Sequence, residues 1–253
     1  MPSAAPRFTA DTLKFLRALK RNNRREWFNA HRDDYEAHVR QPMTAIVERL
    51  AQDFRAFAPE LVASPKVSMY RIYRDTRFSE NKTPYKTHVA AVFPPRGLPK
   101  HEGAGVYFHV SPDEVWVGGG MYSPQTPQLQ AVREHIAANG KKLRSIVESP
   151  AFRRRLGGLE GERLQRVPRG FPQDHPAADY LKYRQFLAGA ELPPAVATSP
   201  KFYGTLLEVF RQVVPLIRFL NAPLRPAFAA QPLRRGKPAG TDPPLRRGRP
   251  STR

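Results

Sequence analysis

The stretch Val106-Tyr-Phe-His-Val-Ser-Pro-Asp-Glu-Val-Trp-Val-Gly-Gly-Gly-Met-Tyr122 decides the fold, because it reads as a β-hairpin. Residues typical of strands stand on both sides of Ser111-Pro112-Asp113-Glu114, which has the composition of a tight turn. With a four-residue turn, Val110 faces Val115 and the side chains alternate between two faces. One face carries Val106, Phe108, Val110, Val115 and Val117, and the other carries Tyr107, His109, Trp116 and Gly118. We expect the first face to lie in the core and the second to form the wall of a site.

Helical patterns stand before and after this hairpin. Residues 8–19, 25–39 and the stretch after Pro42 have helical spacing, and residues 67–74 and 88–93 read as further strands. After the hairpin, Thr126-Pro127, Ser149-Pro150 and Ser199-Pro200 each open a helix, the first of them ending at Gly140 and residues 158–172 forming a loop. This order predicts an α+β fold, in which a small antiparallel β-sheet is flanked by N-terminal and C-terminal helices. We expect one domain over residues 1–224.

Composition points to an anionic partner. The chain has 253 residues and a net charge of +20, which favours phosphate, nucleic acid or an acidic surface. It has no cysteine, which excludes disulfides and thiolate metal sites. The start of the chain has no signal-peptide pattern, and no apolar run reaches membrane-spanning length. We therefore expect a cytoplasmic protein without membrane contact, and the sequence leaves its oligomeric state open.

Residues 225–253 form a basic, Arg/Pro-rich tail that we predict to be disordered. It contains two copies of one motif, Pro232-Leu-Arg-Arg-Gly-Lys-Pro238 and Pro244-Leu-Arg-Arg-Gly-Arg-Pro250. Within the second copy, Arg247-Gly248-Arg249-Pro250 resembles the core of an AT-hook, which lies in the minor groove of AT-rich DNA. The alternative is that the codon bias of a GC-rich genome produced this composition.

Five cations stand close together before the hairpin. They are Arg71, Arg74, Arg77, Lys82 and Lys86. Glu80 is the one acidic residue between Arg77 and Lys86. Because guanidinium groups bind phosphate or carboxylate through paired hydrogen bonds, we predict an anion-binding site here. Alternatively, these side chains pair with local acids or solvate an edge strand.

Aromatic and glycine residues could form the wall of that site. The predicted wall consists of Tyr73, Tyr85, His88, Tyr107, Trp116, Gly118, Gly119, Gly120 and Tyr122. Such rings could stack on a base or sugar, and the glycines would let a ligand or another backbone approach closely. The alternative is an outer sheet face packed under a helix. His109, Asp75 and Glu26 are the candidate acid–base residues if the site is catalytic.

Metal ligands and cofactor motifs are weakly represented. The seven histidines form no His-x-x-x-His pair, and the glycine triplet lacks the pattern of a phosphate-binding loop. We therefore predict no metal site and no cofactor.

Several linked motifs resemble one family. They are Asn23-Arg-Arg-Glu-Trp-Phe28, Tyr73-Arg-Asp-Thr-Arg-Phe78, Lys82-Thr-Pro-Tyr-Lys-Thr87, Tyr107-Phe-His109 and Gly118-Gly-Gly-Met-Tyr122. Together they are similar to the Domain of Unknown Function 2461 family, over about residues 8–224. The resemblance implies an intracellular domain, widespread in bacteria and fungi, whose biochemical role is not established. It therefore supplies no catalytic residues.

Three functions are compatible with these observations. The leading hypothesis is a binding module for a phosphate-bearing ligand, either nucleic acid or a nucleotide, in a cationic pocket with aromatic walls. The second is an enzyme that acts on a phosphorylated or otherwise anionic substrate. The third is a structural module whose Arg-rich segment binds a protein partner.

Overall fold

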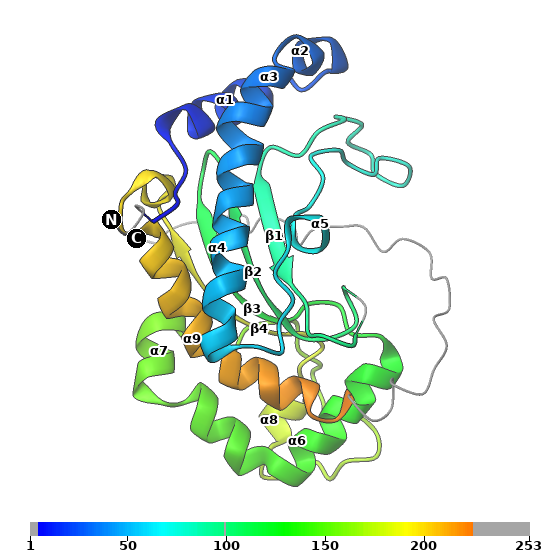
Figure 1. Cartoon of the computed structure of the whole chain (residues 1–253). Coiled ribbons are helices and arrows are strands. Elements are labelled where there is room, and N and C mark those ends of the chain that lie inside the picture. Colours follow the sequence, from blue (N-terminus) through cyan, green and yellow to red (C-terminus); the bar gives the residue numbers. More distant parts are fainter. Residues whose placement is uncertain (1–4, 99, 225–253) are drawn as a thin grey trace, which may run out of the picture.

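The protein has an α+β fold, as predicted, with helices around a four-stranded antiparallel sheet (Figure 1). The computed structural model describes residues 5–98 and 100–224, so the tail and its Arg247–Pro250 motif lie outside the described residues. The strands are β1 (Val89–Phe93), β2 (Gly105–Val110), β3 (Val115–Met121) and β4 (Phe186–Leu192). The α-helices are α1 (Ala10–Arg21), α2 (Arg25–Ala30), α3 (Arg32–Tyr35), α4 (Gln41–Phe57), α5 (Pro65–Ser68), α6 (Thr126–Val147), α7 (Pro150–Leu156), α8 (Ala178–Leu181) and α9 (Phe202–Asn221). A π-helical turn, η1 (Glu36–Arg40), joins α3 to α4, and a 3-10 turn, η2 (Pro194–Thr198), precedes α9.

The hairpin of β2 and β3 has the predicted register. Val110 pairs with Val115, Phe108 with Val117 and His109 with Trp116. Ser111 closes the turn, since its backbone N–H donates to the Glu114 carbonyl at 2.9 Å and its hydroxyl accepts from two backbone N–H groups of the turn. β1 pairs with β2, and β4 pairs with β3, to complete the order β1-β2-β3-β4.

The apolar face of the hairpin is fully buried, as predicted. Helices α4 and α9 cover it (Figure 1). Their aromatic side chains pack against those of the sheet. Phe108 contacts Phe202 and Phe210 of α9, with ring centroids 6.2 and 6.5 Å apart, and Phe54 of α4 lies 5.2 Å from Phe93. Burial of this apolar surface is the main force that holds the helices on the sheet.

One strand prediction was wrong, and one strand was not predicted. Residues 67–74 are not a strand, because Ser64 caps the short helix α5, accepting from the Val67 N–H at 3.3 Å, and Pro65 occupies its first turn. Beyond α5 the segment makes only isolated bridges, such as Met69 with Ala91. The edge strand β4 was not predicted, since Phe186-Leu-Ala-Gly-Ala-Glu-Leu192 is rich in small residues that are rare in strands.

Two helix predictions were also wrong in extent. The helix expected over residues 25–39 is divided at His31 and continues through the π-helical turn, whose His38 carbonyl accepts from the buried Thr12 hydroxyl at 2.5 Å. Helix α6 bends at Asn139 but runs past Gly140 to Val147. Gly140 is needed for packing, because a Cβ there would lie 2.8 Å from the Ala177 side chain.

No helix in the described part of the chain combines the length and the apolarity needed to cross a membrane.

Candidate anion-binding site

The site is built on a short ribbon that precedes β1. Residues 72–74 run antiparallel to residues 84–86, with a bridge between Tyr73 and Tyr85. The Arg74 N–H donates to the Pro84 carbonyl at 2.9 Å, and the Lys86 N–H donates to the Ile72 carbonyl at 2.8 Å. The ribbon thus places Tyr73 and Tyr85 on the same side, with the basic loop of residues 75–83 at its end.

The N-terminal helices hold this ribbon in place. The Asn23 side chain bonds the Tyr85 backbone twice, donating to its carbonyl at 2.9 Å and accepting from its N–H at 3.0 Å. The buried ring of Phe28 stacks on Tyr85 at 4.2 Å between centroids. Tyr73 lies 5.4 Å from Tyr85, so the two phenol rings form one aromatic wall.

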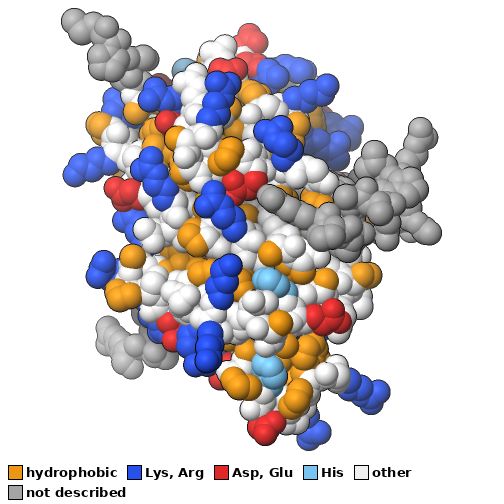
Figure 2. Space-filling model, turned by 60° about the horizontal axis from the view of Figure 1, so that its bottom comes forward, with side chains coloured by type: hydrophobic (Ala, Val, Ile, Leu, Met, Phe, Trp, Pro, Cys, Tyr) orange, Lys and Arg blue, Asp and Glu red, His pale blue; other side chains and the backbone are white. Residues whose placement is uncertain are grey.

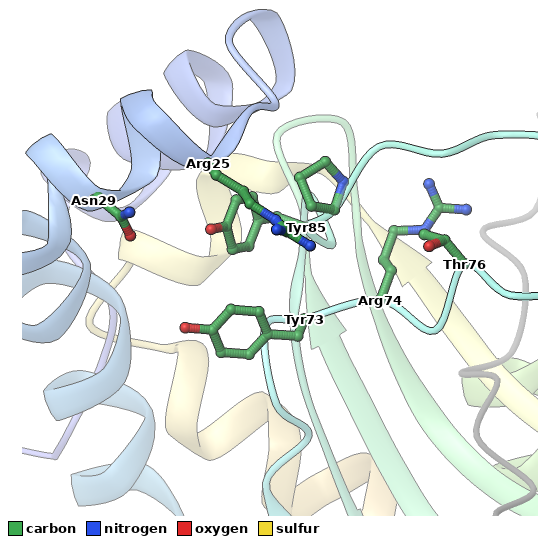
Figure 3. A pocket seen from close by; sticks show the side chains of 7 residues that line it. Arg25, Asn29, Tyr73, Arg74, Thr76 and Tyr85 are labelled. Atoms are coloured by element: carbon green, nitrogen blue, oxygen red, sulfur yellow. The ribbon is translucent and has the colours of Figure 1, made fainter.

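A pocket of about 310 Å³ lies between α2 and the ribbon (Figure 3). Its lining consists of Arg25, Asn29, Tyr73, Arg74, Thr76, Pro84 and Tyr85. Figure 3 shows Arg25 and Asn29 projecting from α2, Tyr73 and Arg74 from the facing ribbon, and Thr76 from the start of the loop. Among the described residues that line this pocket, two are cationic and none is acidic. The lining therefore favours an anion.

The structure fixes the position of the Arg74 guanidinium and the protonation of the Tyr85 hydroxyl. The Arg74 guanidinium donates to the Thr83 hydroxyl, to the Thr83 carbonyl at 3.3 Å and to the Ser79 hydroxyl at 3.4 Å. These bonds fix its position at the base of the loop. Burial raises the pKa of the Tyr85 phenol, so its hydroxyl stays protonated at neutral pH and can donate a hydrogen bond.

The other cations of the loop are bound within the loop. Arg77 holds Asp75 through two side-chain bonds of 3.0 and 2.7 Å, and Lys82 donates to the Thr76 carbonyl at 3.0 Å. The hydrogen bonds from Arg77 lower the pKa of Asp75 to about 2, so this candidate base is an ion-paired carboxylate at neutral pH. Arg71 is exposed on the ribbon, and Glu26 is exposed on α2 beside Arg25.

His109 belongs to a separate hydrogen-bonded cluster on the other side of the sheet from α9. Its Nδ1 lies 3.1 Å from the Tyr107 hydroxyl, and its Nε2 lies 3.0 Å from Glu114 Oε1. All three side chains are buried. Both ring nitrogens are therefore engaged with protein groups.

Two further predicted site residues join this cluster rather than the pocket. The Lys86 ammonium lies 4.9 Å from the centre of the Tyr70 ring, and Tyr70 contacts Tyr107 at 6.3 Å. The His88 ring lies 5.5 Å from that of His109. Tyr73, Arg74 and Tyr85 therefore line the pocket, and the other predicted site residues that the structure describes lie outside its lining.

The predicted glycine wall is occupied by protein atoms. The Trp116 indole lies over Gly118 and over Gly189 of β4, where a Cβ would come within 2.8 and 2.4 Å of the ring. Gly119 faces the core, since its Cβ would lie 2.8 Å from Val213 of α9. Gly120 has a φ of +138°, a conformation that favours glycine, and packs on the Phe186 carbonyl. Tyr122 is half-buried, and burial raises the pKa of its phenol.

A second cavity, of about 370 Å³, lies among α6, α7, α8 and residues 157–163. Its arginines are accompanied by acids: Glu148 accepts from Tyr180 at 2.7 Å and lies 3.9 Å from both Arg144 and Arg153. Figure 2 shows the surface at this end of the molecule, where Lys and Arg side chains are spread widely rather than gathered into one patch. Within the described ranges, no three His, Asp or Glu side chains are grouped as metal ligands. The first pocket thus differs in having no acidic residue in its described lining.

A family model described as "Conserved hypothetical protein (DUF2461)" matches residues 11–219. The chain belongs to this family. The match includes every residue that lines the pocket, the His109 cluster and most of α9, whereas the basic tail lies outside it. Comparison with curated proteins and with solved structures gave no match.

Sequence reasoning missed four lining residues of this DUF2461 pocket. They are Arg25, Asn29, Thr76 and Pro84. Asn23 and Arg25 stood in a quoted motif, but nothing in the sequence spacing placed that motif against residues 73–85. The sequence feature that could have indicated the pocket is the presence of two segments rich in arginine and aromatic residues, 24–28 and 71–78. It indicates that both segments carry the same chemistry but not that they meet.

Proposed function

We propose that this protein binds a phosphate-bearing ligand, a nucleotide or nucleic acid, in the pocket between α2 and the ribbon. The observation that carries the proposal is the lining itself: Arg25 and Arg74 stand with Tyr73 and Tyr85 around about 310 Å³, and no described lining residue is acidic. This volume lies in the usual range for small-molecule sites, about 300 to 1,000 Å³.

The chemistry of the lining fits each part of such a ligand. A guanidinium group makes paired, charge-assisted hydrogen bonds with phosphate oxygens. The Thr76 hydroxyl and the Asn29 amide line the same pocket as further hydrogen-bonding groups. The half-exposed ring of Tyr73 offers a flat surface to a base or a sugar. In contrast, a protein partner that used this region would need a larger apolar patch than this site provides.

Calorimetric titration of the full chain with AMP, ATP and adenosine tests the proposal. Arg25 lines the pocket from α2, so we expect Arg25→Ala to weaken nucleotide binding about tenfold or more, as loss of a charged hydrogen bond does. Arg24→Ala is the matched control, since it removes the same charge from an exposed neighbour outside the lining. Adenosine should bind more weakly than AMP. Equal affinities of the two variants, or no binding of any nucleotide, would contradict the proposal.

We extend the proposal to the tail, whose Arg247–Pro250 motif would add a contact with AT-rich DNA. Support comes from its residue pattern alone, together with the excess of positive charge in residues 225–253.

A further inference from the structure

The loop beside the pocket presents a single aromatic ring to solvent. Phe78 is 95% exposed, whereas the next most exposed large apolar side chains of the described residues, Tyr73 and Val67, are 45% and 37% exposed. The position is not explained by packing, because so exposed a ring contributes almost nothing to the core. The ring is therefore accessible to a ligand.

Hydrogen bonds within the loop hold Phe78 in a defined position. Asn81 Oδ1 accepts from both the N–H and the hydroxyl of Thr83, at 3.0 and 2.8 Å, and the Ser79 N–H donates to the Thr76 carbonyl at 3.4 Å. Together with the bonds of Arg74 and Lys82 described above, they order the backbone on both sides of the ring. The ring is therefore displayed on an ordered loop, which lowers the entropy cost of binding.

Phe78 lies in a basic segment, and one of its cations is beside the ring. The Arg77 guanidinium lies 5.7 Å from the centre of the Phe78 ring, and residues 71–86 carry five Lys and Arg against two acids. An aromatic ring within a basic surface is the arrangement that binds single-stranded nucleic acid, because bases stack on the ring while cations meet the phosphates. A duplex would not fit this mode, since its bases are already stacked on each other.

The ring is also close to the proposed phosphate site along the chain. Thr76 lines the pocket, and Phe78 follows two residues later, at most about 7 Å away along an extended chain. Successive nucleotides lie about 3.4 Å apart in duplex DNA, and an extended single strand is longer per nucleotide, so one or two nucleotides span this distance. One phosphate in the pocket would thus leave a neighbouring base within reach of Phe78.

From these observations we propose that the ligand is a single strand of nucleic acid, with a phosphate between Arg25 and Arg74 and an adjacent base stacked on Phe78. This inference rests on the proposed function, and it adds a second contact and the class of ligand. Stacking on an aromatic ring is open to every base, because each base has a flat face. Binding is therefore tolerant of base sequence.

The test compares two short oligonucleotides of equal length and charge, thymidine hexanucleotide and its abasic analogue, on the full chain at matched salt. We expect the base-bearing strand to bind about 5- to 150-fold more tightly, which is the range for one stacked base. Phe78→Ala should reduce this preference by about 5-fold or more without weakening binding of the abasic strand, and Phe78→Trp should keep it. Val67→Ala is the matched control, because it trims another exposed apolar side chain and should change neither affinity.

The outcomes separate this inference from the proposed function. If the wild-type chain binds both strands equally, or if Phe78→Ala keeps the preference, stacking on Phe78 is wrong. Arg25-dependent affinity for the abasic strand would then still support the phosphate site. If neither strand binds, the single-strand inference is overturned, whereas the phosphate site is judged separately by the titrations with AMP, ATP and adenosine.

Discussion

Individual side chains position the pocket as much as they line it. Asn23 links the end of α1 to the ribbon through two hydrogen bonds with one backbone residue, Tyr85. Phe28 adds an aromatic contact with the same residue. These two contacts join segments that are about sixty residues apart in the sequence, so the pocket exists only where they meet.

Asn23→Ala should destabilise the protein by about 1–3 kcal/mol, because it leaves both the N–H and the carbonyl of Tyr85 without their partner. The measurement is the free energy of unfolding in urea. Asn29→Ala is the control, since this exposed amide lines the pocket but supports no backbone group, and its effect should stay within about 0.5 kcal/mol. A loss of stability with Asn29→Ala equal to that with Asn23→Ala would contradict this account.

Strands β3 and β4 explain why part of the polar face of the hairpin is not open to a ligand. Trp116 on β3 covers Gly118 of the same strand and Gly189 of β4. The small residues of β4 are therefore required by the ring above them. This requirement is also the reason that the strand has so weak a strand pattern.

Gly189→Ala should destabilise the protein by about 1–3 kcal/mol, since the new Cβ would lie 2.4 Å from the indole and force the ring aside. Urea unfolding measures the loss. Tryptophan emission should shift as well, because Trp116 is one of only two tryptophans in the chain.

The same substitution at Gly204 provides the control for Gly189→Ala. Gly204 is exposed on α9 with no atom near its Cβ position, so Gly204→Ala should stabilise the helix by about 0.5–1 kcal/mol. Opposite signs for the two variants are expected. A stabilising Gly189→Ala would show that Trp116 does not lie on this glycine.

On the scale of the whole molecule, the positive charge has two parts. One part is distributed over the folded surface, as Figure 2 shows for one face, and the other is concentrated in residues 225–253. Only the first part includes the pocket. Any affinity for nucleic acid is therefore a sum of a local site and a general attraction between charges.

Removal of residues 225–253 should lower the affinity for duplex DNA and flatten its dependence on salt. Each phosphate neutralised contributes about −0.9 to the slope of log K against log salt, and this segment carries eight Lys and Arg against one acid. The comparison uses the full chain and the chain that ends at Leu224, on AT-rich and GC-rich duplexes at matched salt. If the tail acts as an AT-hook, the full chain should prefer the AT-rich duplex and the shortened chain should not. Equal affinity of the two chains would rule out a role of the tail in DNA binding.

The sequence by itself determined the α+β fold class and the register of the central hairpin. Apolar and polar residues such as Phe108 and His109 alternate along the hairpin, and only one register buries all the apolar ones. The local pattern was therefore sufficient to predict the register. It also determined the basic and aromatic chemistry of residues 71–86. These properties depend on residues that are adjacent in the chain, so they can be read from the sequence.

Only the tertiary structure decided which of these residues share a site. It brought Arg25 of α2 to Tyr73 and Arg74, and it separated His109 into a buried cluster with Tyr107 and Glu114. It also revealed β4, whose small residues acquire their role only beneath Trp116. The physical reason is the same in each case: long-range packing and hydrogen bonds set these neighbours, and no local propensity encodes a contact across sixty residues.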